Sequence, residues 1–268
     1  IIAWASTLLP AEWTSTPWHP LLACALFIVP GVPLINFVDD MLDNYIQVGI
    51  VRAVNTLLMV AAMAFGIAFA VKLFHIENFF PTISMVPHHQ YWEYAIAAAI
   101  SAMGFSMIFN IQRRLLWVVA IGGIIAVCTR NFVNLGPSTD NIGLDMGLVI
   151  GSFSGAVLVS LIAIKAVHWF HVPNHVLTIP SVIPMIPGVL MYRMLFGIIN
   201  INVQSIDQVT PLMKAIESGV NSGLVIMCIA LGVAIPNIFG RRFIASSKNK
   251  RLAELLKERK ACGKFVEW

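Results

Sequence analysis

The sequence predicts an all-α, polytopic transmembrane helical bundle with an inverted repeat and two helices broken by proline and glycine. Hydrophobic residues make up 58% of the 268 residues and charged residues only 11%, which excludes an ordinary soluble domain. Several apolar segments reach the roughly 20 residues of a helical span, and none alternates like a barrel strand. A proline-glycine-valine motif occurs twice in apolar sequence, beginning at Pro30 and at Pro187.

The apolar segment 179–202 is long enough to cross a bilayer, but its own residues interrupt it. The interrupting residues are Pro180, Pro184, Pro187 and Gly188. Because each proline removes a backbone donor, such a break survives only where protein or a watery cavity supplies partners. Arg193 follows one turn later, and a charge in an apolar span typically faces a cavity or an acidic partner and indicates function. The alternative is an arginine that extends to a nearby interface.

An internal repeat is indicated by two matches that occur in the same order. Pro30-Gly31-Val32 matches Pro187-Gly188-Val189 at an offset of 157, and Val54-Asn55-Thr56 matches Val220-Asn221-Ser222 at an offset of 166. A broken element followed by a similar helix is typical of transporter repeats. Asn55 and Asn221 are therefore candidate substrate ligands, although an interhelical hydrogen bond is the more common role for such residues.

An acidic face follows the first motif. Asn36, Asp39, Asp40 and Asp43 fall at i, i+3, i+4 and i+7, which places an amide and three carboxylates along one side of a helix. This face is too acidic to meet lipid. It either lines a cavity that binds a cation, a proton or an ammonium group, or forms a solvated helix end outside the membrane.

The remaining segments complete the predicted bundle. We expect spans at 21–42, 50–74, 94–110, 115–128, 142–169, 179–202 and 214–238, with Arg130 in a connection. Gly143, Gly147, Gly151 and Gly155 recur every four residues and predict one tightly packed helix face. The chain divides into residues 1–75, the last spans of an incomplete first repeat; 76–240, a second repeat of five spans; and 241–268, a basic tail with a short leucine stripe typical of a surface helix.

The basic residues set an orientation. Lysine and arginine collect at Arg113 and Arg114, at Lys165, and after Arg241, and the positive-inside rule places these regions, with the C-terminus, in the cytoplasm. The two broken spans then cross in opposite directions. In this arrangement Arg193 and the positive helix N-termini would hold a carboxylate, and Asp39 or Asp40 would hold an ammonium group or the coupling proton.

Other classes find little support in the sequence. The four cysteines are scattered, and the run His168, His171, His175 contains Pro173 and has no acidic ligand nearby, so we predict no metal and no cofactor. No basic and aromatic patch indicates nucleic acid. An intramembrane enzyme is the alternative from another class, but no HExxH or GxSxG motif is present, and we predict that the chain is not an enzyme.

Two long stretches resemble a known family. PGVPLINFVDDMLDNYIQVGIVRAVNTLLMVAAMAFGIAFA is similar to the end of the first conserved region of the ThrE-type threonine/serine exporters, and FSMIFNIQRR followed by VIPMIPGVLMYRML is similar to their second region. The matching motif residues are Pro30, Gly31, Pro33, Asn36, Asp40, Asn110, Pro184, Pro187, Gly188 and Tyr192. The resemblance adds Tyr192 to the candidate substrate-binding residues.

The resemblance implies ten spans in two halves, a location in the bacterial cytoplasmic membrane, and export of threonine and serine driven by protons. The implied partners are a small polar substrate, protons, the bilayer, and an upstream half or partner subunit, while assembly into a homo-oligomer stays open. Two alternatives remain: a dicarboxylate (succinate) exporter, which Arg193 favours and the Asp39-Asp40 pair opposes, and an accessory membrane subunit of such a transporter.

Overall fold

The computed structural model describes residues 31–73, 90–137, 142–170, 172–199 and 209–261, and these contain helices and no strands. The predicted all-α class is therefore confirmed. In chain order the elements are α3 (Gly31–Leu42), α4 (Ile46–Leu73), α5 (Tyr91–Ile108), the 3-10 turn η1 (Arg113–Leu115), α6 (Leu116–Asn134), α7 (Leu148–Phe170), α8 (Asn174–Val182), the 3-10 turn η2 (Ile183–Met185), α9 (Gly188–Ile199) and α10 (Val209–Ala261).

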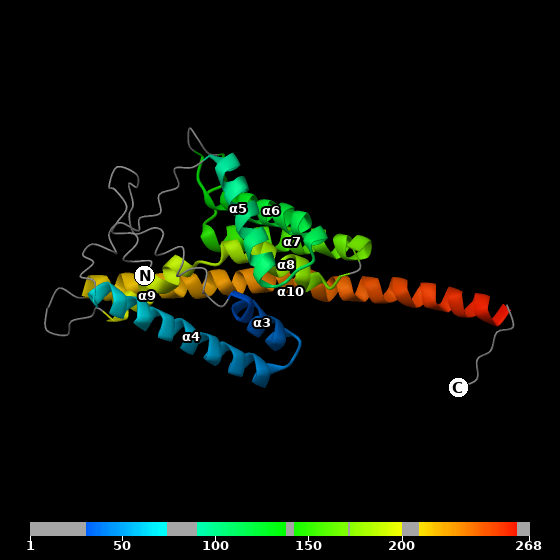
Figure 1. Ribbon diagram of the computed structural model, residues 1–268, viewed down its shortest axis with the longest axis horizontal. Helices are drawn as coiled ribbons and strands as arrows, with labels where there is room; N and C mark the ends of the chain where they lie inside the picture. The colour runs from blue at the N-terminus through cyan, green and yellow to red at the C-terminus, as the bar shows by residue number, and fades with distance from the viewer. Residues whose placement is uncertain (1–30, 74–89, 138–141, 171, 200–208, 262–268) are drawn as a thin grey trace.

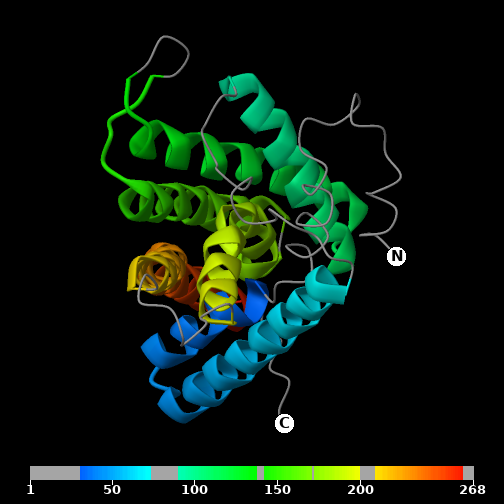
Figure 2. The same ribbon diagram turned by 90° about the vertical axis from the view of Figure 1, so that its left-hand side faces the viewer.

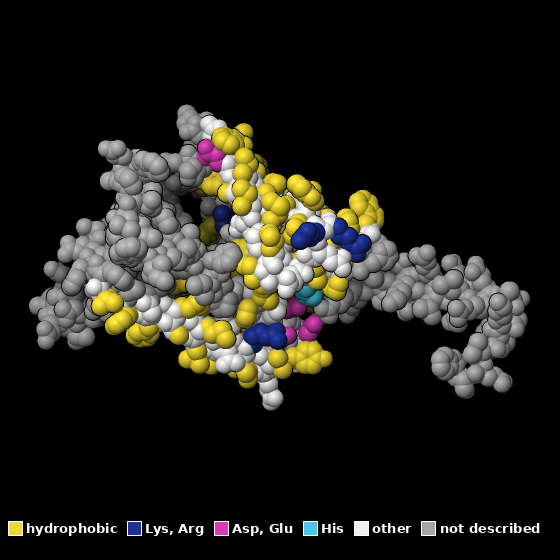
Figure 3. All heavy atoms as spheres, viewed as in Figure 1, with side chains coloured by type: hydrophobic (Ala, Val, Ile, Leu, Met, Phe, Trp, Pro, Cys, Tyr) yellow, Lys and Arg dark blue, Asp and Glu magenta, His cyan; other side chains and the backbone are white. Residues whose placement is uncertain are grey.

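The described helices confirm a multi-pass membrane protein. Stretches in α4, in η1 with α6, in α7 and in α10 are long and apolar enough to cross a membrane, and α8, η2 and α9 form a fifth, broken crossing bent by 53°. The first half of the span predicted at 21–42 lies outside the described residues. Apolar side chains also cover much of the visible surface along α4 and α5 (Figure 3), which is what helices facing lipid require.

The long helix α10 is the axis of the bundle. It runs through the molecule with α3 and α4 on one side and α5 to α8 on the other (Figure 1), and it packs against α7, α9 and α3. A view at right angles shows α4 at the edge of the bundle (Figure 2). Only 17% of the α4 span is buried, compared with 56% of the α10 span.

The core lies where α3, α5, α6, α7, α8, η2 and α10 meet. It is formed by small and branched side chains, among them Ile35 of α3, Ala126 of α6, Val159 of α7, Val182 of α8 and Ile229 of α10. Because lipid is as apolar as these residues, the core is held by close packing rather than by exclusion of water. Ile35 and Val38 therefore fix α3 against the second half of the chain.

The glycine face is confirmed in part. Gly151 and Gly155 lie in α7, where an added Cβ would come within 2.6 Å of the carbonyl oxygens of Arg130 and Ala126 in α6. The prediction was wrong for Gly143 and Gly147, because α7 begins only at Leu148 and Gly147 has a φ of +89°. Residues 142–147 instead form a non-helical segment before α7.

This segment folds back onto the end of α6. The N–H groups of Leu144, Asp145 and Met146 donate to the carbonyls of Phe132, Leu135 and Val133 at 2.9–3.1 Å. The last carbonyls of a helix lack partners within the helix, so the segment satisfies them. Gly143 must be glycine here, since a Cβ would collide with the carbonyl oxygen of Leu135.

Three expectations about where helices end or break differ from the structure. The span predicted to end at residue 128 continues to Asn134, so Arg130 lies inside α6 and not in a connection. Pro180 does not break its helix but lies inside α8, where the hydroxyl of Ser181 donates to the carbonyl of Leu177. The helix expected after residue 240 is not separate, because α10 continues without interruption for 53 residues.

We predict that Gly155→Ala lowers the melting temperature of the purified protein, because its Cβ would meet backbone rather than a movable side chain. Overpacking of this kind costs about 1–3 kcal/mol, or a few degrees for a chain of this size. Thermal unfolding in detergent measures the change. The control is Gly223→Ala in α10, where a Cβ meets open space; an equal loss in both variants would contradict the close α6–α7 contact.

Candidate functional site

A helix adjoins each of the two proline-glycine motifs. The described part of α3 begins at Gly31, and α9 begins at Gly188, directly after Pro187. The chain before α9 turns at Ile186, whose backbone is extended, and the turn is closed by hydrogen bonds from Gly188 N–H to Ile186 O at 2.9 Å and from Leu190 N–H to Pro187 O at 3.1 Å. The backbone groups at the break therefore find hydrogen-bond partners within the turn itself.

The first motif touches the break in the second. A Cβ on Gly31 would lie 2.8 Å from Cδ1 of Ile186 and 3.5 Å from Cγ1 of Ile183. A larger residue at position 31 would have to displace the end of the Ile186 side chain, so the glycine favours this close approach of α3 to the break. Pro30 lies outside the described residues, so contact between the motifs is seen through Gly31 alone.

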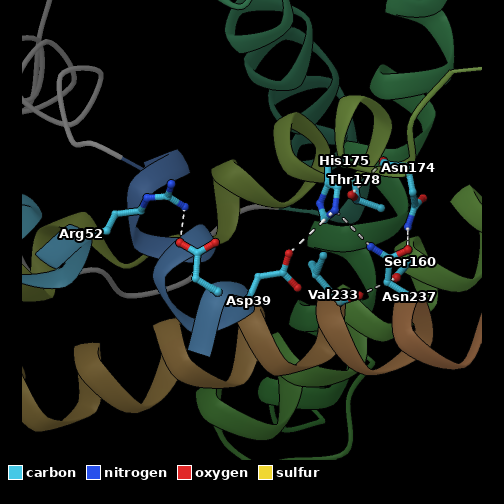
Figure 4. A network of polar contacts seen from close by, with 9 residues as sticks. Asp39, Arg52, Ser160, Asn174, His175, Thr178, Val233 and Asn237 are labelled. Atoms are coloured by element: carbon cyan, nitrogen blue, oxygen red, sulfur yellow. Dashed lines mark hydrogen bonds and ion pairs between the residues drawn. The ribbon is translucent and has the colours of Figure 1, made fainter. Parts of the chain in front are cut away.

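A polar network links the far end of α3 to the second half of the chain (Figure 4). Asp39 Oδ2 lies 3.8 Å from His175 Nε2 of α8, and the same Nε2 lies 3.4 Å from Asn237 Nδ2 of α10. Asn174 Nδ2 donates to Asn237 Oδ1 at 3.0 Å. Asn237 is only 6% exposed, so the network lies largely between helices.

The network extends to two more backbone contacts drawn in the same view (Figure 4). Ser160 Oγ of α7 donates to Val233 O of α10 at 2.9 Å, and Thr178 Oγ1 donates to Asn174 O at 3.0 Å. Ser160 and Thr178 are both fully buried. Polar side chains thus hold α3, α7, α8 and α10 together at this level of the bundle.

Two carboxylates on the acidic face of α3 point toward different helices. Asp39 points toward His175, while Asp40 pairs with Arg52 of α4 at 2.5 Å. The Asp40 and Arg52 side chains are 24% and 38% exposed, so water reaches this pair. Of the other two residues on this face, Asn36 is half-buried and Asp43 is exposed.

A cavity of about 510 Å³ lies beside the Asp40–Arg52 pair, between α3 and α4. Its lining includes Pro33, Gln47, Arg52, Asn55 and Thr56. Asn55, predicted from the repeat, therefore faces an open space that a small polar molecule could enter. Its counterpart Asn221 is exposed on α10, and neither amide makes a hydrogen bond to another described residue.

The predicted residues of the second motif lie in α9. Tyr192 is 2% exposed and Gly188 is buried, while Pro187 and Arg193 are partly buried. In the part of the chain that the structure describes, Arg193 makes no ion pair, so no contact joins it to Asp39 or Asp40. Asn174 and Asn237 were missed by the sequence analysis because an isolated amide in an apolar segment gives no pattern.

The fold and the site together define a class: a multi-pass membrane protein with two short helices that begin at broken, touching motifs and with buried polar groups between its halves. The model of a family described as "Threonine/Serine exporter, ThrE" matches residues 94–239, and that of "Putative threonine/serine exporter" matches residues 1–74. The first match covers more than half of the chain, and the chain belongs to the threonine/serine exporter family. No solved structure matches it.

We predict that reversing either charge of the Asp40–Arg52 pair disturbs the packing of α3 on α4, because like charges would then meet. Asp40→Arg or Arg52→Asp alone should lower the melting temperature, and the double variant should recover most of the loss. The coupling should be small, about 1 kcal/mol or less, since the pair is partly exposed. Glu217→Gln on the exposed face of α10 is the control; no recovery in the double variant would argue against the pair.

Proposed function

We propose that the chain forms the translocation part of a transporter that exports threonine and serine across the bacterial cytoplasmic membrane by proton-coupled alternating access. The observation that carries this proposal is the contact of Gly31 with Ile183 and Ile186. Two helices that begin at interrupted motifs and meet inside a bundle are the arrangement by which many secondary transporters build a substrate site.

The packing of the two short helices supports an inverted repeat. α3 packs against its following helix α4 and against α10, and α9 packs against its following helix α10 and against α4. Each short helix thus contacts both long ones, as two copies related by a twofold axis would. Thr56 and Ser222, which follow the matched asparagines, are each 2% exposed, so the corresponding helices also bury corresponding residues.

The charges near the break suit a carboxylate group. The N-terminus of α9 carries partial positive charge and, with Arg193 and Tyr192, would hold the carboxylate of the solute. Asp39 lies eight residues beyond Gly31, or about 12 Å along α3, which is too far for it to hold the ammonium group of the same solute. Asp39 would therefore carry the coupling proton, because Asp40 is already paired with Arg52.

The Asp39–His175–Asn237 contacts suit a proton carrier. His175 Nε2 lies between a donor, Asn237 Nδ2, and an acceptor, Asp39. A bare Nε2 would accept from Asn237 Nδ2, whereas an Nε2–H, which the neutral tautomer and the charged ring can both carry, would turn toward Asp39, 3.8 Å away. We propose that a proton taken up at Nε2 moves His175 from α10 toward α3 and so changes the contact between the two halves.

We propose that the C-terminal end of α10 lies in the cytoplasm, because arginine and lysine collect after residue 240. We also propose that further spans, from the same polypeptide or from a partner subunit, complete the first half of the repeat. An accessory role for this chain is the alternative, and co-purification with a chain that transports alone would favour it.

Counterflow tests the substrate. We expect proteoliposomes that contain the purified transporter, with any subunit that co-purifies with it, to accumulate radiolabelled threonine and serine when unlabelled solute is loaded inside. Succinate should not accumulate. Accumulation of succinate alone would select the dicarboxylate exporter, and accumulation of none of the three would reject the proposed function.

A second experiment tests proton coupling. We predict that Asp39→Asn abolishes accumulation driven by a proton gradient but leaves counterflow, because exchange needs no net proton movement. Asp43→Asn, one turn further along the same helix end, is the matched control and should keep both activities. If Asp39→Asn still accumulates threonine in response to a proton gradient, Asp39 does not carry the proton.

A further inference from the structure

Arg130 is a charged residue inside the apolar span of α6, outside the site described above. The residue as a whole is partly buried, but its guanidinium lies deep among other atoms, with Tyr94 of α5 near enough to act on it electrostatically. An arginine within a span is costly unless it has a partner or a polar cavity. Its neighbour Asn131 is 5% exposed.

The two side chains have more donors than acceptors. Arg130 Nε and Nη2 donate to Asn131 Oδ1 at 3.3 and 3.2 Å, and Nδ2 of Asn131 is buried and has no partner. Among the described residues no carboxylate pairs with Arg130. A guanidinium has five N–H donors and no acceptor, so the pair is short of acceptor atoms.

Several backbone carbonyls at the end of α6 are already in use. The carbonyls of Phe132, Val133 and Leu135 accept from residues 144–146, and the carbonyl of Asn131 accepts from Leu135 N–H at 2.8 Å. The folded-back segment thus takes the carbonyls that an arginine near a helix C-terminus would otherwise bind. An acceptor from outside these groups is needed to satisfy the unused donors.

The position of Arg130 relates it to the broken crossing. A Cβ on Gly155 would lie 2.6 Å from Ala126 O of α6 and 3.1 Å from Met185 Sδ, just before the break. Arg130 is four residues beyond Ala126, or about 6 Å further along the helix. It therefore lies one turn past the break, toward the end of α6 that is remote from Arg113 and Arg114.

We propose that Arg130 and Asn131 form a second anion site, which receives the carboxylate of the transported solute after it passes the break. The inference rests on the proposed function for the identity of the solute. The arginine would supply the charge and a fork of N–H groups, which matches a carboxylate, and Asn131 Nδ2 would add a further donor. Arg193 and Arg130 would then serve successive positions of one anionic group.

Binding of threonine, measured as a shift in melting temperature, tests this site. Titration of the purified transporter with threonine should raise its melting temperature, and threoninol, which lacks the carboxylate, should not. In Arg130→Gln the threonine concentration needed for the shift should rise at least about tenfold, the loss expected for hydrogen bonds to a charged group. Arg130→Lys keeps the charge without the fork, so it reports binding if the glutamine variant folds poorly. Arg114→Gln, exposed at the start of α6, is the control.

Each outcome is decisive. An unchanged threonine response in Arg130→Gln or Arg130→Lys would overturn the site. So would an Arg130-dependent rise in melting temperature with anionic lipid but not with threonine, since the guanidinium would then bind a lipid phosphate. Failure of the proposed function is a separate result: the wild-type protein would show no counterflow of threonine or serine. An Arg130-dependent response to succinate in that protein would keep the anion site and reject the amino-acid substrate.

Discussion

The constraint on which the structure depends is that a backbone in hydrocarbon must satisfy its own hydrogen bonds. The interruption at Ile186 and Pro187 meets it by closing a turn on itself and by lying against the start of α3 at Gly31. Contact at this point brings a helix from residues 31–42 into the core of the later helices. The two regions matched by separate family models thus form one packed body.

Polar residues in this bundle follow a common rule: most have a partner, either on another helix or, like Thr178, within their own helix. Asp39, His175, Asn174 and Asn237 form a chain across α3, α8 and α10, and Ser160 of a fourth helix, α7, donates to a carbonyl of α10. Arg130 and Asn131 depart from this rule, because their donors exceed the acceptors around them. In a membrane protein, a charged group with unused hydrogen-bond donors is a place where a ligand is expected to bind.

Sequence reasoning succeeded where a pattern repeats and failed where a single contact decides. The helix end at Leu42 follows from apolar length, and a helix adjoins each glycine motif as expected. The predicted end of the fourth span at residue 128 was wrong because Thr129, Arg130 and Asn131 looked like a polar connection. They remain helical because the backbone keeps its hydrogen bonds and the side chains are accommodated inside the bundle.

The sequence by itself determined the class, the broken crossing and the family, because hydropathy, proline positions and motif residues are local properties of the chain. Only the tertiary structure decided that Asp39 turns to His175 while Asp40 turns to Arg52. Adjacent residues on a helix point about 100° apart, so their partners depend on which helices pack on either side. Arg52 comes from the next helix along the chain, but His175 comes from a segment more than a hundred residues away, and no local pattern records which of the two carboxylates meets it.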